Sequence, residues 1–485
     1  MSFTVSICLM SGQLADLEVT SSQSVQELMC EASKQLGRPL TALAYQGRRL
    51  LRGEKVEELG LEDGSVVNAL VRQPGSVLCG HRKCGAFAAL KHDGAVATWG
   101  HPDCLGSSPL NRTVNAHRLY ASSCAFAAIT DEGEVVAWGD PTCGGDCQDV
   151  AEELRFVQHI YASQGAFAAV KTDGSVVAWG SPRCGGDAGA VQSQLWQVRS
   201  VVATHRAFAA LCIDGTVVTW GHAQCGGDSS AVRNQLTDVE EIYATETAFA
   251  ALRSNGDVIA WGDDLCGGDA RAVQDQLRNV SSIFASNKAF AALKENGSVV
   301  TWGKALSGGN SSAVHDQLYD VERVYCGHAM AALRKDGSVI TWGHSAYGGD
   351  SRNVQGKLLD VEQIYASDAA FAALKQDRTI VAWGHSEYGG DSSAIQEELV
   401  SIQTVQATSS AFAALREDGT VHTWGLPHKG GDSSSVQDQL YEVKEIAGSY
   451  GAFAALRNDG AIITWGDANY GGDSSPVQPL IVDMF

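Results

Sequence analysis

Short apolar runs separated by glycine-containing turns recur along most of this chain, and the segment Val280–Leu318 shows the unit. Val280–Ala285 alternates apolar and polar residues, which predicts a half-buried strand. Ala289–Lys294 predicts a second strand and Ser298–Trp302 a third, and the pair Asn296-Gly297 between them is a strong hairpin signal. The unit is therefore predicted to be a small antiparallel sheet.

The remainder of the unit is more polar. After Gly308-Gly309, the segment Ser311–Val314 is expected to form an outer fourth strand, and Asp316–Leu318 a helical turn. The residue that follows the Gly-Gly pair suits an Asx turn, in which its side-chain oxygen accepts a backbone N–H two residues on. A calcium site would need several oxygens around one ion, and one carboxylate per unit does not supply them. These residues are Asp146, Asp187, Asp228, Asp269, Asn310, Asp350, Asp391, Asp432 and Asp473.

The pair Trp-Gly marks ten copies of the unit. Its tryptophans are Trp99, Trp138, Trp179, Trp220, Trp261, Trp302, Trp342, Trp383, Trp424 and Trp465. The copies are 39 to 41 residues apart, with 41 the usual step, and an aromatic stands twelve residues before each Trp except where Met330 replaces it. A fixed period over many copies is typical of solenoids and propellers. The repeats predict that residues 74–485 form one domain.

The expected hairpin register determines how the units pack. A two-residue Asn-Gly turn would place Ala291 opposite Trp302, so that Phe290 and Trp302 point to opposite faces of one sheet. Each sheet would then offer its Trp face to one neighbour and its Phe face to the other, and the sheets must stack. Small sheets stacked around an axis are the blades of a β-propeller. We expect a closed or nearly closed ring, with an open spiral or a division into seven plus three blades as the alternatives.

The first 73 residues predict a separate α+β domain. Thr4–Leu9 and Leu14–Val19 are expected strands of a hairpin, and Leu43–Tyr45 and Val66–Val71 are two later strands. Between them, Ser24 and Glu27 form the signature of a capping box, followed by apolar residues at helical spacing.

This leader resembles ubiquitin in the order of its elements and in the segments Leu17–Val19, Ala44–Leu50 and Leu61–Ser65. The resemblance implies a ubiquitin-like β-grasp domain over residues 1–73. The chain continues through Gln73–Gly75 without a terminal double glycine, so we expect no conjugation. The apolar patch that ubiquitin receptors contact would map to Met10, Ala44 and Leu70, and Ala44 is smaller than the aliphatic residue usual there.

The repeats resemble those of the regulator-of-chromosome-condensation family. The segment Cys326–Leu333 is the closest single copy, because it keeps the Gly-His of that family. The resemblance implies a β-propeller that binds proteins, and the period of 41 is near that of the bacterial β-lactamase-inhibiting propeller. Relatives that join such propellers to ubiquitin chemistry are ligases with a HECT domain, and the 20 residues after Trp465 leave no room for a catalytic lobe.

Charge and hydropathy narrow the class of partner. The net charge of −21 repels phosphate backbones and anionic lipids, so nucleic acid and membrane are not expected partners. We expect no signal peptide, because the N-terminal residues lack a basic stretch followed by an apolar one, and no apolar run is long enough to cross a membrane. We expect a monomer in the cytoplasm, with the nucleus as the alternative.

The cysteines are expected to be free thiols. Five of the 13 stand five residues after their Trp, namely Cys104, Cys143, Cys184, Cys225 and Cys266. Equivalent positions on stacked sheets lie about 10 Å apart, whereas disulfides need Cα atoms within about 7 Å. Cys143 and Cys147 could approach within one loop, but this spacing is a weak metal signal. We therefore expect no metal and a reducing compartment.

No motif for catalysis or for a cofactor is present, and repeated positions are unlike an active site, which is singular. The sequence favours a non-catalytic scaffold or adaptor whose propeller binds a protein client and whose leader connects to ubiquitin-pathway or proteasome receptors. The alternative is an inhibitor or regulator of one enzyme, including nucleotide exchange on a small GTPase.

The predicted client patch lies in the loops that follow each Trp. Positions two to five after the Trp vary between fixed glycines, so the loops form one variable rim. Idle solvent loops are the simpler interpretation, and we favour it for the cysteine-bearing repeats. Exposed tyrosines are common interface anchors, and the residues predicted to bind the client are Tyr347, Tyr388, Tyr470, His344 and His385.

Overall fold

The computed structural model describes residues 2–9, 14–36, 40–45, 48–50, 54–71, 78–80, 85–90, 95–105 and 112–475. Within them, the N-terminal unit is a five-stranded mixed sheet with one helix, in the strand order β2-β1-β5-β3-β4. Its elements are β1 (Ser2–Leu9), β2 (Leu14–Thr20), α1 (Val25–Leu36), β3 (Leu40–Tyr45), β4 (Arg48–Leu50), η1 (Val56–Glu58) and β5 (Ser65–Val71). The first and last strands pair in parallel, and the other pairs are antiparallel.

The helix of this unit begins as its capping box predicts. The Glu27 carboxylate accepts the backbone N–H of Ser24 at 2.8 Å, and the backbone N–H of Glu27 donates to the Ser24 hydroxyl at 3.3 Å. The apolar face of α1, including Val25 and Leu28, is fully buried against the sheet, where Ile7 and Val67 complete the core.

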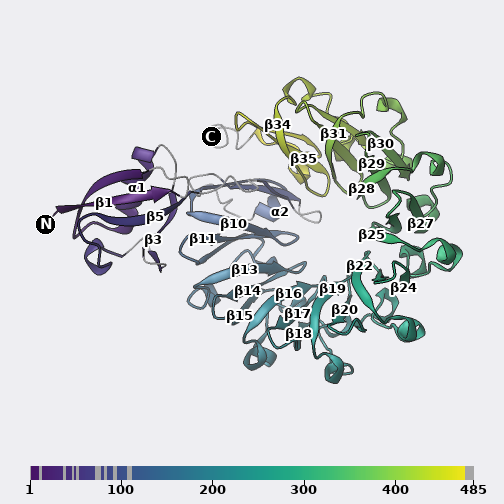
Figure 1. Cartoon of the computed structure of the whole chain (residues 1–485), viewed down its shortest axis with the longest axis horizontal. Helices are drawn as coiled ribbons and strands as arrows, with labels where there is room; N and C mark the ends of the chain where they lie inside the picture. Colours follow the sequence, from purple (N-terminus) through teal and green to yellow (C-terminus); the bar gives the residue numbers. More distant parts are fainter. Residues whose placement is uncertain are drawn as a thin grey trace.

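The rest of the described chain forms ten small antiparallel sheets, which we number as blades 1 to 10 in chain order. Figure 1 shows them following one another around a ring, from blue through green to yellow. The first strands are β6 (Leu78–Gly80), β10 (Ala116–Ala121), β13 (Val157–Ala162), β16 (Val198–Ala203), β19 (Val239–Ala244), β22 (Val280–Ala285), β25 (Val321–Cys326), β28 (Val361–Ala366), β31 (Ile402–Ala407) and β34 (Val443–Gly448).

The second and third strands of each blade form a hairpin. The second strands are β7 (Ala86–Leu90), β11 (Ala125–Thr130), β14 (Ala166–Lys171), β17 (Ala207–Cys212), β20 (Ala248–Arg253), β23 (Ala289–Lys294), β26 (Ala329–Arg334), β29 (Ala370–Lys375), β32 (Ala411–Arg416) and β35 (Ala452–Arg457). The third strands are β8 (Ala95–Gly100), β12 (Val135–Gly139), β15 (Val176–Gly180), β18 (Val217–Gly221), β21 (Val258–Gly262), β24 (Val299–Gly303), β27 (Val339–Gly343), β30 (Ile380–Gly384), β33 (Val421–Gly425) and β36 (Ile462–Gly466). Blade 1 adds the short strand β9 (Arg112–Thr113) beside β8.

The hairpin register corrects the face assignment made from sequence. Phe290 pairs directly with Trp302, so the two rings lie on the same face of the sheet and stack with centroids 5.1 Å apart. The loop holds three residues rather than two, because Lys294 pairs with Ser298 and Gly297 adopts a left-handed φ of 79°. A type I turn closed by such a glycine adds one residue to the loop. A register shift of one residue places every side chain of the third strand on the opposite face of the sheet from the one expected.

Blade packing follows from this register. The Phe and Trp of blade 6 pack on the small face of blade 5, formed by alanines together with Leu252 and Val258. The opposite face of blade 6, with Ala291 and Leu293, receives the Met330 and Trp342 of blade 7. Each blade therefore has one aromatic face and one face of small residues, and the bulky side chains of one blade fill the space that the alanines of the preceding blade leave.

The blades close on themselves. Phe87 and Trp99 of blade 1 share a core with Ala454 and Leu456 of blade 10. The indole Nε1 of Trp99 donates to the carbonyl oxygen of Gly471 at 3.0 Å. The first strands also contact their neighbours all around the ring, β34 and β6 included. The arrangement is thus a propeller-like ring, and these contacts agree with the expected closure.

The polar segment outside blades 2 to 9 is helical, which corrects the fourth strand expected there, whereas in blade 1 the short strand β9 pairs with β8. Ser311–Val314 falls largely within the 3₁₀ helix η11, which includes the helical turn expected nearby. The outer helices are η3 (Gln148–Val150), η5 (Gly189–Gln194), η7 (Arg233–Gln235), η9 (Arg271–Gln276), η11 (Ser312–Gln317), η13 (Gln355–Lys357), η15 (Ser393–Ile395) and η17 (Gln437–Gln439). In several blades a glutamine of this segment donates to a third-strand carbonyl, as Gln274 does to Val258 at 3.0 Å. The segment therefore covers the outer edge without strand pairing.

One local prediction is confirmed. The Asx turns form after the Gly-Gly pairs, where the carboxylate of Asp228, for example, accepts the backbone N–H of Ser230 at 2.9 Å. Arg378, which stands where the other hairpins have glycine, has a left-handed φ of 64°. Among the described residues, no helix has the length and apolar character needed to cross a membrane.

Candidate protein-binding rim

The segments that follow each Trp-Gly pair are short helical turns, which we call the rim turns. They are α2 (Pro102–Leu105), η2 (Pro141–Cys143), η4 (Pro182–Cys184), η6 (Ala223–Cys225), η8 (Asp264–Cys266), η10 (Ala305–Ser307), η12 (Ser345–Tyr347), η14 (Ser386–Tyr388), η16 (Pro427–Lys429) and η18 (Ala468–Tyr470).

Each rim turn from η2 onward ends at a glycine that the next blade requires. Gly348, with a φ of 95°, stands so close to the neighbouring blade that an added Cβ would lie 2.5 Å from Cδ2 of Phe371. Its carbonyl accepts the indole N–H of Trp383 at 3.0 Å. The glycine thus connects successive blades through close packing and a hydrogen bond. This explains why the residue is glycine in each of these repeats while the residues before it vary.

A hydroxyl group holds the last residue of most rim turns. The loop between the first and second strands, which we call the axial loop, begins with Ser or Thr in these blades. Ser367 donates to the carbonyl of Tyr388 at 3.0 Å, and Ser449 donates to that of Tyr470 at 2.7 Å. The backbone of the last rim-turn residue is therefore fixed by contacts that do not involve its own side chain. For this reason, the side chain at that position is able to differ between blades.

The axial loops are joined around the ring by backbone hydrogen bonds of 2.8–3.1 Å between successive blades. Among the described residues, these bonds run from blade 2 to blade 6 and from blade 7 to blade 10. Blade 7 has a two-residue axial loop, Gly327-His328, where blade 6 has three residues. The N–H of His344 therefore donates to the carbonyl of Leu306 in the preceding blade at 2.8 Å.

Four of the five predicted client-binding residues lie together on blades 7 and 8. The rings of His344 and Tyr347 stack at 4.2 Å, and Tyr347 lies 6.3 Å from His385. His385 meets Tyr388 edge to face at 5.0 Å. His328, from the shortened axial loop, adds a fifth ring 5.6 Å from Tyr347. We call these five residues the aromatic row.

The tyrosines are half-buried rather than exposed, which corrects one premise of their choice. The two histidines occupy the N-cap position of their rim turns, where Asp467 of blade 10 accepts the N–H of Asn469 at 3.0 Å. Nδ1 of His344 and of His385 is buried without a hydrogen-bond partner among the described residues. A buried polar atom left unpaired is costly, and the ring contacts of these histidines are those with Tyr347 and Tyr388.

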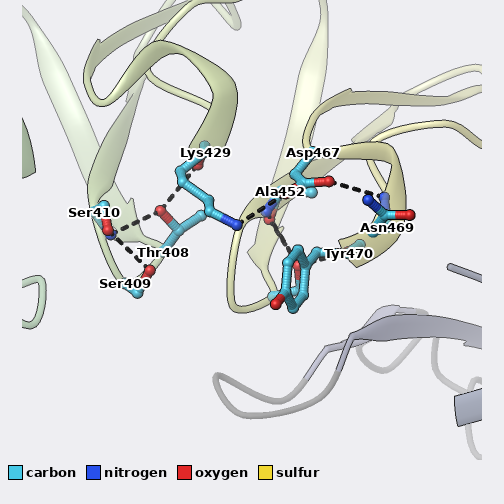
Figure 2. A network of polar contacts seen from close by, with 9 residues as sticks. Thr408, Ser409, Ser410, Lys429, Ala452, Asp467, Asn469 and Tyr470 are labelled. Carbon is cyan, nitrogen blue, oxygen red and sulfur yellow. Dashed lines mark hydrogen bonds and ion pairs between the residues drawn. The ribbon is translucent and has the colours of Figure 1, made fainter. Parts of the chain in front are cut away.

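Tyr470, the fifth predicted residue, lies apart from the aromatic row in a second group on blades 9 and 10. Figure 2 shows Lys429 reaching from blade 9 toward Asp467 beside the ring of Tyr470. The Lys429 Nζ lies 2.8 Å from Asp467 Oδ2 and 4.1 Å from the centre of the Tyr470 ring. The ring of Tyr450, from the axial loop, lies 5.1 Å from that of Tyr470. We call these four residues the lysine group.

The charge balance in the lysine group favours an ion pair at neutral pH. Burial alone would raise the pKa of Asp467, but the hydrogen bond and the positive charge of Lys429 outweigh it and hold the pKa below its ordinary value. The pair is mostly shielded from solvent, with 15% of the Lys429 side chain and 19% of the Asp467 side chain exposed. Lys429 therefore links the rims of two blades.

Large rim side chains occur where the axial loop leaves room. Gly451 precedes the second strand of blade 10, and an added Cβ would lie 2.6 Å from Lys429 Cδ and 3.3 Å from Tyr470 Cδ2. The same position is Ala369 in blade 8 and is deleted in blade 7. Each rim tyrosine thus accompanies a small or missing axial residue, but this feature alone does not mark these blades, because Gly85 and Gly165 hold the same position in blades 1 and 3, whose rim turns carry cysteine.

Sequence reasoning missed several rim residues. The residues missed are His328, which belongs to the aromatic row, and Lys429 and Tyr450, which belong to the lysine group. Only an alignment of these positions with the other repeats would have revealed them. Leu265 and Leu306 are 79% and 57% exposed on the rim turns of blades 5 and 6.

The predicted patch on the leader is only partly described. Ala44 is half-buried in β3 opposite Asn68, and Leu70 lies in β5 opposite Ala42. Met10 lies outside the described residues.

Nothing in the described part of the chain assembles three or more His, Cys, Asp or Glu residues in a way that could hold a metal ion. The described cysteines of the rim turns form no disulfide bonds. Burial, together with the nearby Asp140 carboxylate, raises the pKa of Cys143 to about 11. Such a thiol is protonated at neutral pH and is a weak nucleophile. The chain matches no protein-family model and no curated protein sequence.

Proposed function

We propose that this protein is a non-catalytic interaction scaffold or adaptor, in which a regulator-of-chromosome-condensation-type propeller binds a protein client. The observation that carries the proposal is the concentration of large aromatic and cationic side chains on the rim of blades 7 to 10. Tyr347, Tyr388, Lys429 and Tyr470 occupy the position that holds cysteine or serine in blades 1 to 6.

The physical support lies in pre-organisation. The rim turns that carry Tyr388, Lys429 and Tyr470 are fixed by hydroxyl contacts to their backbone carbonyls, at 2.7–3.1 Å. A partner that docks on them therefore loses little free energy in ordering the loops. Half-buried tyrosines with rings held by stacking are typical of binding hot spots, which are well packed before the partner arrives.

The leader supplies the second half of the proposal. Its strand order and single helix support a ubiquitin-like domain that connects the client to ubiquitin-pathway or proteasome receptors. The receptor surface would include Ala44, Leu70 and Met10. Cytoplasmic or nuclear action accords with this assignment, and no cofactor is required.

The client surface is tested by capture from cell extract with the full chain, followed by quantitative mass spectrometry. We expect the double variant Tyr347→Ala/Tyr388→Ala to lose specific clients by at least about 30-fold, because even a single hot-spot tyrosine contributes about 2 kcal/mol. The matched control is Tyr319→Ala/Tyr441→Ala, which removes two exposed tyrosines that precede first strands. An unchanged client profile for the rim variant would refute the proposal.

Because the rim tyrosines also pack, their removal could act through stability, so the melting temperature of each variant is measured in parallel. Glu387→Lys provides a second test, since Glu387 is exposed in the same rim turn as Tyr388 and its side chain has no described ion pair. We expect this change to reduce client capture without lowering the melting temperature.

The leader is tested separately in the full chain. Ala44→Arg should abolish binding to purified proteasomes while client capture persists, because the two surfaces belong to different domains. Glu18→Arg, a change at an exposed residue of β2, is the control. Proteasome binding that survives Ala44→Arg, or that is never observed, would leave the scaffold without the proposed connection.

A further inference from the structure

The first strands of the blades form the inner wall of the ring. Figure 1 shows β22 and β25 toward the centre of the ring, with the third strands β24 and β27 of the same blades farther out. Successive first strands contact one another, as β25 does with β28 and β28 with β31. The side chains of these strands therefore determine how the inner wall is filled.

The fifth position of the first strand is aromatic in six of the nine blades from blade 2 onward. Its residues are Tyr120, Tyr161, Val202, Tyr243, Phe284, Tyr325, Tyr365, Gln406 and Ala447. Each aromatic side chain at this position packs against the core that its blade shares with the next one. Among the described residues, the core between blades 9 and 10 has no such aromatic, because blade 9 has Gln406 there.

A pocket of about 470 Å³ lies where this aromatic series stops, along the inner wall of blades 7 to 10. Its lining includes Tyr325, Tyr365, Gln406, Ala407 and Gly448. The volume is within the range of ligand pockets, about 300–1,000 Å³. Two tyrosines thus border one part of the pocket, and smaller or polar residues border the part where the repeat would otherwise place another ring.

The wall of the pocket is uncharged. Of the described residues that line it, none carries a charge at neutral pH. Burial raises the pKa of the Tyr325 phenol, and it raises the pKa of the Cys326 thiol, which also lines the pocket, to about 12. Both shifts indicate surroundings in which an anion is poorly solvated. The pocket therefore favours a neutral molecule over an ionised one.

Gln406 supplies a polar group to this wall. Its side chain is exposed and forms no hydrogen bond with the described residues, so its amide is able both to donate and to accept. The rings of Tyr325 and Tyr365 offer aromatic surface, and aromatic pairs attract each other in offset or edge-to-face contact. These features match a planar aromatic molecule that carries a hydroxyl group.

We propose that the pocket binds a small, neutral aromatic molecule with a hydroxyl group, which takes the place that an aromatic side chain has in six other blades. The ring of the ligand packs beside Tyr365, and its hydroxyl group bonds to the amide of Gln406. The site lies on the inner wall of the ring, so it goes beyond the client surface on the rim.

The test is a ligand-observed NMR titration of the purified full-length protein. The probes are para-cresol, which is the side-chain analogue of tyrosine, toluene, which lacks the hydroxyl group, and para-toluate, which is an anion. We expect saturable binding of para-cresol, about five- to tenfold tighter than that of toluene, the difference made by one hydrogen bond. Para-toluate should bind at least about tenfold more weakly than para-cresol, because the uncharged wall does not solvate its carboxylate.

Variants at the fifth position locate the site. Gln406→Tyr gives blade 9 the residue usual in the repeat, so the fold should tolerate it and binding of para-cresol should be lost. Val202→Tyr is the matched control, because it makes an equivalent change in blade 4, outside the pocket lining, and should leave binding unaltered. Gln406→Leu should bind para-cresol and toluene equally. If Gln406→Tyr lowers the melting temperature, the loss of preference in Gln406→Leu decides.

Three results would overturn the proposal. They are no saturable binding of para-cresol, equal binding by Gln406→Tyr and the wild type, and binding of para-toluate as tight as that of para-cresol. The guanidinium of Arg323 lies 5.6 Å from the centre of the Tyr325 ring, and the last result would mean that its charge governs binding. Glu387→Lys, which tests the client surface, should leave binding of para-cresol unaltered, so failure of the two proposals is distinguishable.

Discussion

The indole of Trp99 donates a hydrogen bond of 3.0 Å to the carbonyl of Gly471, 372 positions later in the chain. The same bond joins every other described pair of a Trp and the preceding rim glycine, at 2.8–3.0 Å and a separation of 34 or 35 residues. The junction of blades 10 and 1 is therefore built like the junctions within the ring.

This equivalence predicts equal effects of Gly471→Ala and Gly267→Ala. An added Cβ would lie 2.4 Å from Phe87 Cδ2 in the first case and 2.6 Å from Phe290 Cδ2 in the second. Each change should destabilise by the cost of a left-handed alanine, about 1–2 kcal/mol, plus about 1–3 kcal/mol of overpacking. Chemical denaturation measures both.

Gly64→Ala is the control for this comparison. Its φ of 80° is also left-handed, but nothing lies within 4 Å of the added Cβ, so only the backbone cost applies. If Gly471→Ala costs no more than Gly64→Ala, blades 1 and 10 do not pack as described.

The buried tryptophans should dominate the stability of the ring. Trp302→Ala removes a buried ring and its hydrogen bond to Gly267, with an expected cost of about 3–5 kcal/mol. Trp196 lies outside the repeat register and is 57% exposed, so Trp196→Ala should change stability by about 0.5 kcal/mol or less. Similar losses for the two variants would contradict the packing.

The stacked pair in blade 6 predicts energetic coupling. Phe290→Leu and Trp302→Leu should together cost about 0.5–1.5 kcal/mol less than the sum of the single changes, because either one already breaks the stack. A double-mutant cycle measures the coupling. Strict additivity would instead favour rings on opposite faces of the sheet.

The Lys429–Asp467 pair predicts a defined pH dependence. Because the pKa of Asp467 is lowered in the folded state, its contribution to stability is present above its ordinary pKa and is lost as pH falls through the lowered value. Melting temperatures measured from about pH 6 down to about pH 2 should therefore fall more in the wild type than in Asp467→Asn. The asparagine keeps an N-cap acceptor but has no charge. Parallel curves would exclude this contribution.

Relief of backbone strain should stabilise blade 8. Arg378 has a left-handed φ of 64°, which costs about 1–2 kcal/mol in a residue other than glycine. Its ion pair with Glu362, at 3.3 Å between exposed side chains, offsets about 0.2–1 kcal/mol of this cost. Arg378→Gly should therefore raise stability by up to about 1 kcal/mol, measured by denaturant midpoint. The reverse change, Gly297→Arg, should destabilise the hairpin of blade 6.

The repeat and its strands could be predicted from sequence because the period and the turn glycines are local signals. The face of the sheet on which Trp302 lies could not be predicted from sequence. A two-residue loop and a three-residue loop both contain the same Asn-Gly pair and differ only in the strand register that they produce. The helical outer segment was also missed, because a short polar run carries no periodicity that separates a 3₁₀ helix from an edge strand.

The candidate site was recoverable only in part. The variable position that holds Tyr347 and Tyr388 was visible in the sequence, but its exposure was not, because neighbouring rings cover Tyr347 and the core between blades 8 and 9 packs against Tyr388. Tyr470 lies on blade 10, apart from the aromatic row, and its group includes Lys429, whose contact with Asp467 joins residues 38 positions apart. Such contacts follow from the ring and not from the repeat.

Among the described strands, each blade takes all of its members from one stretch of chain, and none is exchanged where blades 10 and 1 meet. The blade that comes first is therefore set by covalent connectivity and not by geometry. Circular permutation tests this directly, since a chain opened between any two blades and joined at the present seam would contain the same ten junctions. In this respect, the packing of the ring does not distinguish any blade as the first.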